Sequence, residues 1–211
     1  MNTAIKLCGL NDLESVRTAA ACRADAVGFV FYPPSPRAVD LTQVMGFQSV
    51  LPPFVTRVGL VVDPDVAFVQ GLIESRCLDV IQFHGRETGH FCEQFRFPYL
   101  KALPAHPEVA RADYWIKKQA EYPNAKAFLL DTPDTGLKGG TGQTFDWQHW
   151  PASAPKPLIL SGGLTFDNVV QAISATRPYA VDLSSGIESQ RGQKCQKKMA
   201  AFVAKVRSID G

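Results

Sequence analysis

The sequence predicts a (β/α)8 TIM barrel, an α/β fold, as a single domain over residues 1–211. Two observations predict this fold class. Eight short β-rich segments occur along the chain, each followed by a loop and a helix-compatible stretch. Most of them are nearly continuous apolar runs, typical of parallel strands covered by helices on one side and packed with side chains on the other. A chain of 211 residues can bury one such core.

The predicted strands are spaced as βα units. They are Ala4–Cys8, Ala26–Phe31, Arg57–Val62, Asp79–His84, Tyr99–Ala102, Lys126–Asp131, Leu158–Ser161 and Tyr179–Ser184. The fifth has the weakest pattern. Their carboxyl ends are separated by 18 to 31 residues, close to one βα unit each. This spacing leaves no room for another large module.

Helical patterns lie between the predicted strands. The segment Asp12–Cys22 is predicted as a helix with Asn11 as its N-cap, and Gln193–Val206 as a basic closing helix. Residues 132–157 are rich in proline and contain the glycine-rich LKGGTG. The sixth helix is therefore expected to be short, over Asp146–Trp150 only.

A doubly wound open sheet is the alternative architecture for alternating strands and helices. The barrel is favoured because no G-x-G-x-x-G turn follows the first strand, and because polar residues gather where the strands end. In TIM barrels the catalytic residues lie at the carboxyl ends of the strands. We therefore expect the functional site at the carboxyl ends of the strands.

Charge and cysteine content limit the partners, metal sites and cellular compartment that we expect. Lys and Arg total 22 against 20 Asp and Glu, a formal net charge of +2, so neither nucleic acid nor a membrane is expected as a partner. The five cysteines contain no C-x-x-C pair, so we expect no metal site and a reducing compartment. No signal peptide pattern is present, and no run approaches about 20 apolar residues. We therefore expect a cytoplasmic protein.

Glycine turns after three strands predict a phosphate site. Ser161–Gly163 follows the seventh strand, Ser184–Gly186 the eighth, and Gly139–Gly142 lies in the sixth loop. Glycine lets backbone N–H groups approach an anion, and a short helix starting near Ser185 would aim its N-terminus at it. Taken alone, the loop after the seventh strand or the loop after the eighth could need glycine merely to turn. The candidate phosphate-binding residues are Gly140, Gly142, Gly162, Gly163, Ser184, Ser185 and Gly186.

Cys8 and Asp131 end the first and sixth strands and are the candidates for proton transfer. A free thiol titrates near ~8.5, so a modest depression would make Cys8 a general base near neutral pH. The nearby Lys6 could help, or could fill the barrel core. Asp131 follows three apolar residues and is costly to place there without a partner or a purpose. The alternatives are a core cysteine and a capping or salt-bridged aspartate.

Two further charged residues are candidates for substrate binding. Asp182 interrupts the apolar run of the eighth strand and needs a donor: a lysine, an arginine or a ligand amine. Arg37 ends the proline-stiffened segment Pro33–Arg37 and suits a carboxylate or a phosphate, unless it is a simple surface arginine. His84 ends the fourth strand, and no metal-ligand or Ser/His/Asp pattern includes it.

Seven groups of residues, in order along the chain, resemble motifs of the phosphoribosylanthranilate isomerase family of tryptophan biosynthesis. They are Lys6–Leu10, Gly28–Phe31 with Pro33–Arg37, Gln82–Gly85, Leu129–Asp131, Gly139–Gly142 with Phe145–Trp147, Ser161–Leu164 and Val181–Glu188. The resemblance covers essentially the whole chain. Asn11 and Ser161 stand where the family usually carries Thr and Ala, and Phe83 replaces the more usual Leu.

The resemblance implies a monomeric or dimeric TIM barrel without a cofactor. Its reaction is the Amadori rearrangement of N-(5-phosphoribosyl)anthranilate to 1-(2-carboxyphenylamino)-1-deoxyribulose 5-phosphate. By motif, Cys8 would be the general base and Asp131 the general acid. Arg37 and Asp182 would meet the anthranilate end of this phosphorylated small molecule, and the glycine loops would hold its phosphate.

The sequence leaves two alternative functions. Indoleglycerol-phosphate synthase and the histidine-pathway sugar isomerase are also barrels with phosphate-binding loops, and the first should show lysine and glutamate at strand ends. Lys6 and Lys101 lie near strand ends, so this alternative is weakened rather than excluded. A barrel that only senses a sugar phosphate is the other alternative. The presence of both Cys8 and Asp131 argues against it.

Overall fold

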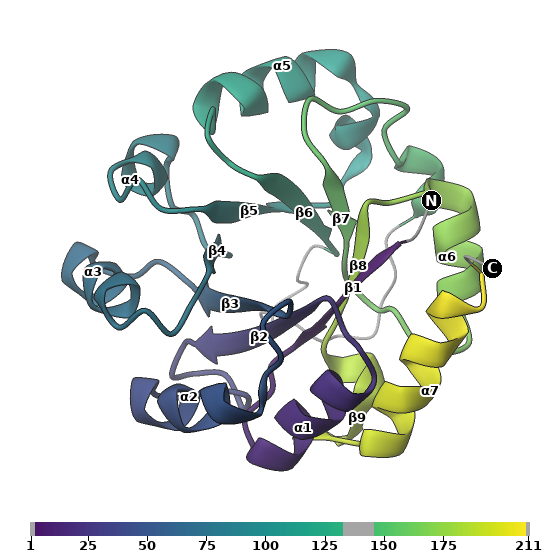
Figure 1. The fold of residues 1–211 in the computed structure, drawn as a ribbon. Coiled ribbons are helices and arrows are strands. Elements are labelled where there is room, and N and C mark those ends of the chain that lie inside the picture. Colours follow the sequence, from purple (N-terminus) through teal and green to yellow (C-terminus); the bar gives the residue numbers. More distant parts are fainter. Residues whose placement is uncertain (1–2, 133–145, 210–211) are drawn as a thin grey trace.

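The predicted barrel is confirmed. The computed structural model describes residues 3–132 and 146–209, and its eight parallel strands pair in chain order into a closed barrel with helices outside (Figure 1). The strands are β1 Ala4–Cys8, β2 Ala26–Phe31, β3 Thr56–Val61, β4 Val80–Phe83, β5 Tyr99–Pro104, β6 Ala127–Asp131, β7 Leu158–Leu160 and β8 Ala180–Leu183. The weakest predicted strand, β5, is two residues longer than expected. The assignment of all residues 1–211 to one domain stays a prediction.

Helices follow the strands as the βα pattern requires. The α-helices are α1 Leu13–Ala21, α2 Leu41–Phe47, α3 Val66–Glu74, α4 Gly89–Glu93, α5 Ala112–Glu121, α6 Val169–Thr176 and α7 Gln196–Arg207. Four 3₁₀ turns are described: η1 Gln48–Val50, η2 Pro107–Ala110, η3 Trp147–His149 and η4 Ser185–Ile187. The single turn η3 agrees with the short sixth helix that was expected. None of the helices described is long and apolar enough to cross a membrane.

The predicted N-cap of α1 is wrong. Asp12 caps this helix, because its carboxylate accepts hydrogen bonds from the backbone N–H and the hydroxyl of Ser15. Both Asn11 and Asp12 are good N-cap residues, and sequence preference alone does not separate neighbours. The Asn11 side chain instead donates to the backbone oxygen of Gly192, 181 positions away.

The predicted start of the closing helix is also wrong. Gln193–Lys194 forms β10, which pairs antiparallel with β9, Glu188–Gln190, and α7 begins only at Gln196. The turn of this hairpin uses Gly192 at φ +84°, a left-handed conformation that favours glycine. The helical pattern of the following residues hid this short hairpin in the sequence.

Two layers of packing explain why the strands read as apolar runs. Alternate strand residues point outward and pack against the helices, among them Leu7, Phe29 and Phe128. The others point into the barrel, where the apolar layer comprises Val58, Leu100, Ala102, Ala127, Leu129, Ile159 and Ala180. The interior is thus filled rather than open, as is usual for this fold. The site has to lie above this layer, at the carboxyl ends of the strands.

Candidate active site

A cavity of about 420 Å³ lies at the carboxyl ends of the strands. All eight strands or the loops after them contribute to its wall. The lining includes Cys8, Val30, Leu60, His84, Ala102, Asp131, Ser161 and Asp182. This is the location that the barrel fold predicts for catalytic residues.

Cys8 and Asp131 line this one cavity, from opposite parts of the barrel sheet. Cys8 is only 4% exposed. Burial raises the pKa of its thiol, and the positive charge of Lys6 opposes that shift without cancelling it. The modest depression of the pKa that would make Cys8 a base near neutral pH is therefore not seen in this structure, where burial raises the pKa instead.

Lys6 and Asp182 form a buried ion pair inside the barrel. They are paired in register on β1 and β8, and Lys6 Nζ lies 2.7 Å from Asp182 Oδ1. Lys6 is thus the donor that Asp182 was expected to need. Burial lowers the pKa of Lys6, but Asp182 and Cys8 outweigh burial and raise it above its ordinary value, so Lys6 remains an ammonium. Ser161 adds a hydroxyl that donates to Asp182 Oδ2 over 3.4 Å.

Asp131 has a histidine partner that the sequence did not indicate. His84 Nε2 lies 3.2 Å from Asp131 Oδ2, and His84 Nδ1 lies 2.8 Å from Gln82 Nε2. The backbone N–H of Thr132 donates to Asp131 Oδ1. β5 pairs with both β4 and β6, so the carboxyl ends of β4 and β6 lie on the two sides of β5 and these side chains can meet across it. Their shared place at strand ends was the one available signal.

The two glycine turns after β7 and β8 reach the cavity. Gly162, Gly163, Ser184 and Ser185 line it, and the 3₁₀ turn η4 begins at Ser185 as expected. Gly162 has φ +86°, and a Cβ there would lie 2.1 Å from Thr132 Oγ1. Only glycine fits at this position.

Gly186, a further phosphate-loop candidate, does not line the cavity. It packs against the loop after β7, where a Cβ would lie 2.0 Å from the backbone oxygen of Leu164. Gly140 and Gly142 lie outside the described residues.

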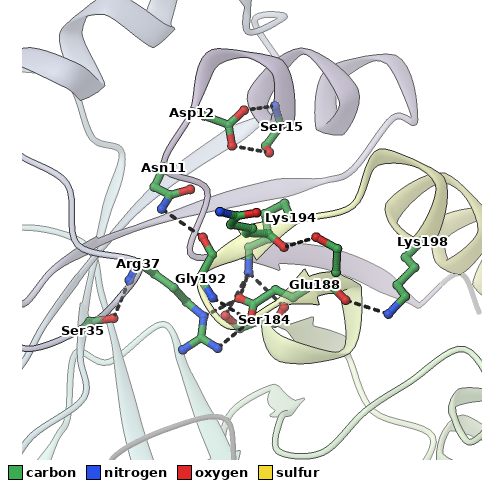
Figure 2. A network of polar contacts seen from close by, with 12 residues as sticks. Asn11, Asp12, Ser15, Ser35, Arg37, Ser184, Glu188, Gly192, Lys194 and Lys198 are labelled. Atoms are coloured by element: carbon green, nitrogen blue, oxygen red, sulfur yellow. Dashed lines mark hydrogen bonds and ion pairs between the residues drawn. The ribbon is translucent and has the colours of Figure 1, made fainter.

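Arg37 also lines the cavity, but it is not a free surface arginine. It is 7% exposed, and Glu188 accepts hydrogen bonds from its Nε and Nη2 (Figure 2). Lys194 Nζ lies 2.9 Å from the same carboxylate. The sequence placed Glu188 in a family motif but gave no sign of these partners, because they are 151 and 6 positions away.

Fold and site together define the class: a (β/α)8-barrel enzyme with ionisable side chains around a cavity beside two glycine-rich loops. Comparison with known proteins identifies the family within this class. The family model for N-(5'phosphoribosyl)anthranilate (PRA) isomerase matches residues 5–205. The chain belongs to this family, whose members are isomerases of tryptophan biosynthesis.

Individual relatives agree with the family match. The N-(5'-phosphoribosyl)anthranilate isomerase of Cellvibrio japonicus is 46% identical, covering 94% of this chain and 91% of the relative. A phosphoribosyl anthranilate isomerase solved with reduced 1-(o-carboxyphenylamino)-1-deoxyribulose 5-phosphate is 30% identical, with a TM-score of 0.79 and coverage of 98% and 99%. A structure of generated monomers of the dimeric Thermotoga maritima enzyme is 30% identical, with a TM-score of 0.78 and the same coverage.

Proposed function

We propose that this chain converts N-(5-phosphoribosyl)anthranilate into 1-(2-carboxyphenylamino)-1-deoxyribulose 5-phosphate, with Cys8 as general base and Asp131 as general acid. The observation that carries this proposal is the single cavity lined by both residues and by Gly162, Gly163 and Ser185. A group held by its phosphate at the glycine loops would lie between a thiol and a carboxyl group. Such fixed placement removes much of the entropic barrier to proton transfer.

The first step opens the sugar ring. Asp131 carries a proton and donates it to the ribose ring oxygen, while the bond between that oxygen and C1′ breaks. The nitrogen lone pair forms a Schiff base with C1′. His84, 3.2 Å from Asp131, holds the carboxyl group in place for this transfer.

The second step moves a proton away from carbon. The Cys8 thiolate removes the proton from C2′, and the electron pair forms the C1′–C2′ double bond of an enolamine. The enolamine then tautomerises to the ketone. Lys6 stabilises the thiolate, because its ammonium interacts with the Cys8 sulfur from within the barrel.

Different residues bind the two ends of the substrate. Arg37 pairs with the anthranilate carboxylate through the edge of its guanidinium that Glu188 leaves open, and Asp182 contacts the same end of the substrate. The phosphate occupies the loops after β7 and β8. We assign Gly140 and Gly142 to this phosphate site, together with Gly162, Gly163, Ser184, Ser185 and Gly186.

We also propose that the enzyme works in the cytoplasm, as a monomer or a homodimer. The five cysteines are all free thiols, which suits a reducing compartment. The Thermotoga maritima relative described as dimeric supports a homodimer as one of the two states. The molecular mass of the purified protein, measured by analytical ultracentrifugation, distinguishes the monomer from the homodimer.

An activity assay tests the proposed reaction. Purified protein is expected to consume N-(5-phosphoribosyl)anthranilate, followed by its anthranilate fluorescence, without added metal or nucleotide. Cys8→Ala and Asp131→Asn should each lose at least about 100-fold in kcat, the usual contribution of a general acid or base, and still bind the product. The control Cys77→Ala removes a thiol buried outside the cavity. Absence of turnover by folded wild-type protein contradicts the reaction, and full activity of either variant contradicts that residue's role.

A further inference from the structure

The hairpin formed by β9 and β10 brings one buried carboxylate between two cations. Glu188, 6% exposed, accepts four hydrogen bonds: from Nε and Nη2 of Arg37, from Nζ of Lys194 and from the backbone N–H of Gly192 (Figure 2). These four donors use the whole capacity of a carboxylate. Burial raises the pKa of Glu188, but the hydrogen bonds from Arg37 and Lys194 outweigh burial and lower it. Glu188 is therefore ionised.

Glu188 fixes the direction of Arg37. It occupies the edge of the planar guanidinium formed by Nε and Nη2, at 2.9 Å for the Nη2 contact. Within the described parts of the chain, Nη1 has no acceptor, and Arg37 lines the cavity. A bidentate pair of this kind leaves the other edge of the guanidinium oriented for a second carboxylate. Without Glu188, the arginine side chain would lose this orientation.

Lys194 extends the same contacts to the loop after β8. Its ammonium has three protons and three acceptors: the backbone oxygen of Ser184 at 2.9 Å, the Ser184 hydroxyl at 3.2 Å and Glu188 at 2.9 Å. The side chain is completely buried. Lys194 therefore fixes Ser184, which lines the cavity at the proposed phosphate loop.

The hairpin is attached to the rest of the barrel on several sides. Asn11 donates to the backbone oxygen of Gly192, and Lys198 of α7 donates to the backbone oxygen of Glu188 (Figure 2). Gly192 lies against the segment Pro33–Arg37 after β2, where a Cβ on Gly192 would be 2.8 Å from the backbone oxygen of Pro36. The hairpin thus contacts the loops after β1 and β2 as well as the loop from which it emerges.

We propose that Glu188 and Lys194 are positioning residues that hold the two anion-binding ends of the cavity, Arg37 and Ser184, in one fixed arrangement. This inference rests on the proposed function, in which Arg37 binds the anthranilate carboxylate and the β8 loop binds the phosphate. Neither residue transfers a proton. Their loss should weaken ligand binding much more than it changes the pH dependence of kcat.

A ratio of two affinities tests the role of Glu188. The probes are reduced 1-(o-carboxyphenylamino)-1-deoxyribulose 5-phosphate and its counterpart without the carboxylate, measured by calorimetry on the same protein. Wild type should bind the carboxylated probe roughly tenfold or more tightly, as a charge-assisted contact allows. In Glu188→Gln the ratio should fall close to one, and in Glu188→Asp it should be intermediate. A general loosening of the fold affects both probes and leaves their ratio unchanged.

The outcomes separate this inference from the proposed function. A wild-type ratio that persists in both variants overturns the role of Glu188 and leaves the Arg37 assignment intact. A wild-type ratio near one overturns both. If Glu188→Gln does not fold, Glu188→Asp decides by the same ratio. Glu14→Gln, an exposed glutamate on α1, is the matched control and should keep the wild-type ratio.

The role of Lys194 is tested with inorganic phosphate as the probe. Lys194→Met should raise the dissociation constant of phosphate about tenfold, because Ser184 loses both contacts that hold it. Lys197→Met, at an exposed position of α7, is the matched control and should bind phosphate as wild type does. An unchanged dissociation constant in folded Lys194→Met overturns this part of the proposal.

Discussion

At the level of single residues, the surroundings of Cys8 determine the pKa of its thiol. Its thiol is buried, which raises its pKa, and Lys6 opposes the shift. Because the base is the thiolate, kcat/KM should rise with pH through the neutral range. Its ascending limb should have an apparent pKa above that of an ordinary thiol. A pH profile of kcat/KM measures this limb, and a limb below the ordinary thiol range would contradict the assignment.

Removing the charge of Lys6 should move the ascending limb of the kcat/KM profile to a higher pH. In Lys6→Gln the burial of the thiol remains and the opposing charge is gone. Alkylation of Cys8 by iodoacetamide, followed by peptide mass spectrometry over a range of pH, reads the ionisation without substrate. The half-buried Cys195 in the same sample serves as the internal control. Equal alkylation profiles of Cys8 in the two proteins would show that Lys6 does not support the thiolate.

His84 should matter for the rate rather than for binding. Its Nε2 lies 3.2 Å from Asp131, so His84→Asn leaves the acid without its ring partner. We expect kcat to fall about tenfold, less than the loss of at least about 100-fold expected on removing the acid itself, and KM to stay within about twofold. Steady-state kinetics measure both. His90→Asn, an exposed histidine on α4, is the control; a change in KM alone for His84→Asn would disprove this role.

Several residues that line the site could be inferred from the sequence, but not what each of them contacts. Cys8 and Asp131 were identified because they end apolar strands, and Asp182 because a carboxylate that interrupts an apolar strand needs a partner. The partners of Arg37 and Asp131 were missed, because each partner is distant in the sequence. Glu188 reaches Arg37 through the pairing of β8 with β1, and His84 reaches Asp131 across β5. Local pattern contains no information about such distant pairs.

At the level of elements, another buried ion pair fixes the loop after β4. Lys101 of β5 lies 2.9 Å from Glu87, and its ammonium also donates to the backbone oxygens of Phe83 and Gly85. Glu87 in turn accepts from the backbone N–H groups of Asp63 and Gly85. The pair lies outside the barrel interior and does not line the cavity. It therefore supports the loop that carries His84, and the lysine does not have the role expected of a synthase.

Breaking the Lys101–Glu87 pair should lower the free energy of unfolding substantially. Lys101→Met leaves Glu87 as an uncompensated buried charge, which destabilises a protein by roughly 3–5 kcal/mol. Urea unfolding measures the loss. Lys118→Met, which removes a partly exposed partner of Glu121 on α5, should cost under about 1 kcal/mol. Similar losses in the two variants would mean that the buried pair has no special role in stability.

Strands were easier to predict than the short elements between them. Most β-strands of the barrel are nearly continuous apolar runs, and such runs are visible without knowledge of the fold. The β9–β10 hairpin is only five residues of strand, Glu188–Gln190 and Gln193–Lys194, and depends on the contacts of Glu188 and Lys194. Its tertiary contacts overrode the helical pattern that suggested an earlier start for α7.

For the molecule as a whole, the strand order of the barrel makes the two glycine loops neighbours. β7 and β8 pair directly, so the loops after them lie together on the same end of the barrel. A ligand that binds only the folded chain stabilises it by about 2.7 kcal/mol at 100 times its dissociation constant. For a domain of this size, that is a rise in the unfolding temperature of roughly 5–11 °C. Inorganic phosphate should produce such a rise, and chloride at equal ionic strength should not.

The phosphate-dependent rise should disappear when the β7 loop is distorted. Gly162→Ala puts a Cβ 2.1 Å from Thr132 Oγ1 on a backbone with φ +86°, so the loop has to move away from its ligand-binding conformation. The variant should unfold at a lower temperature without phosphate and should gain little when phosphate is added. Gly46→Ala, on α2 with no atom within 4 Å of the added Cβ, should keep the full rise. Thermal unfolding with and without phosphate compares each variant with itself, so the cost of backbone strain cancels. An equal rise in both variants would place the bound phosphate away from the β7 loop.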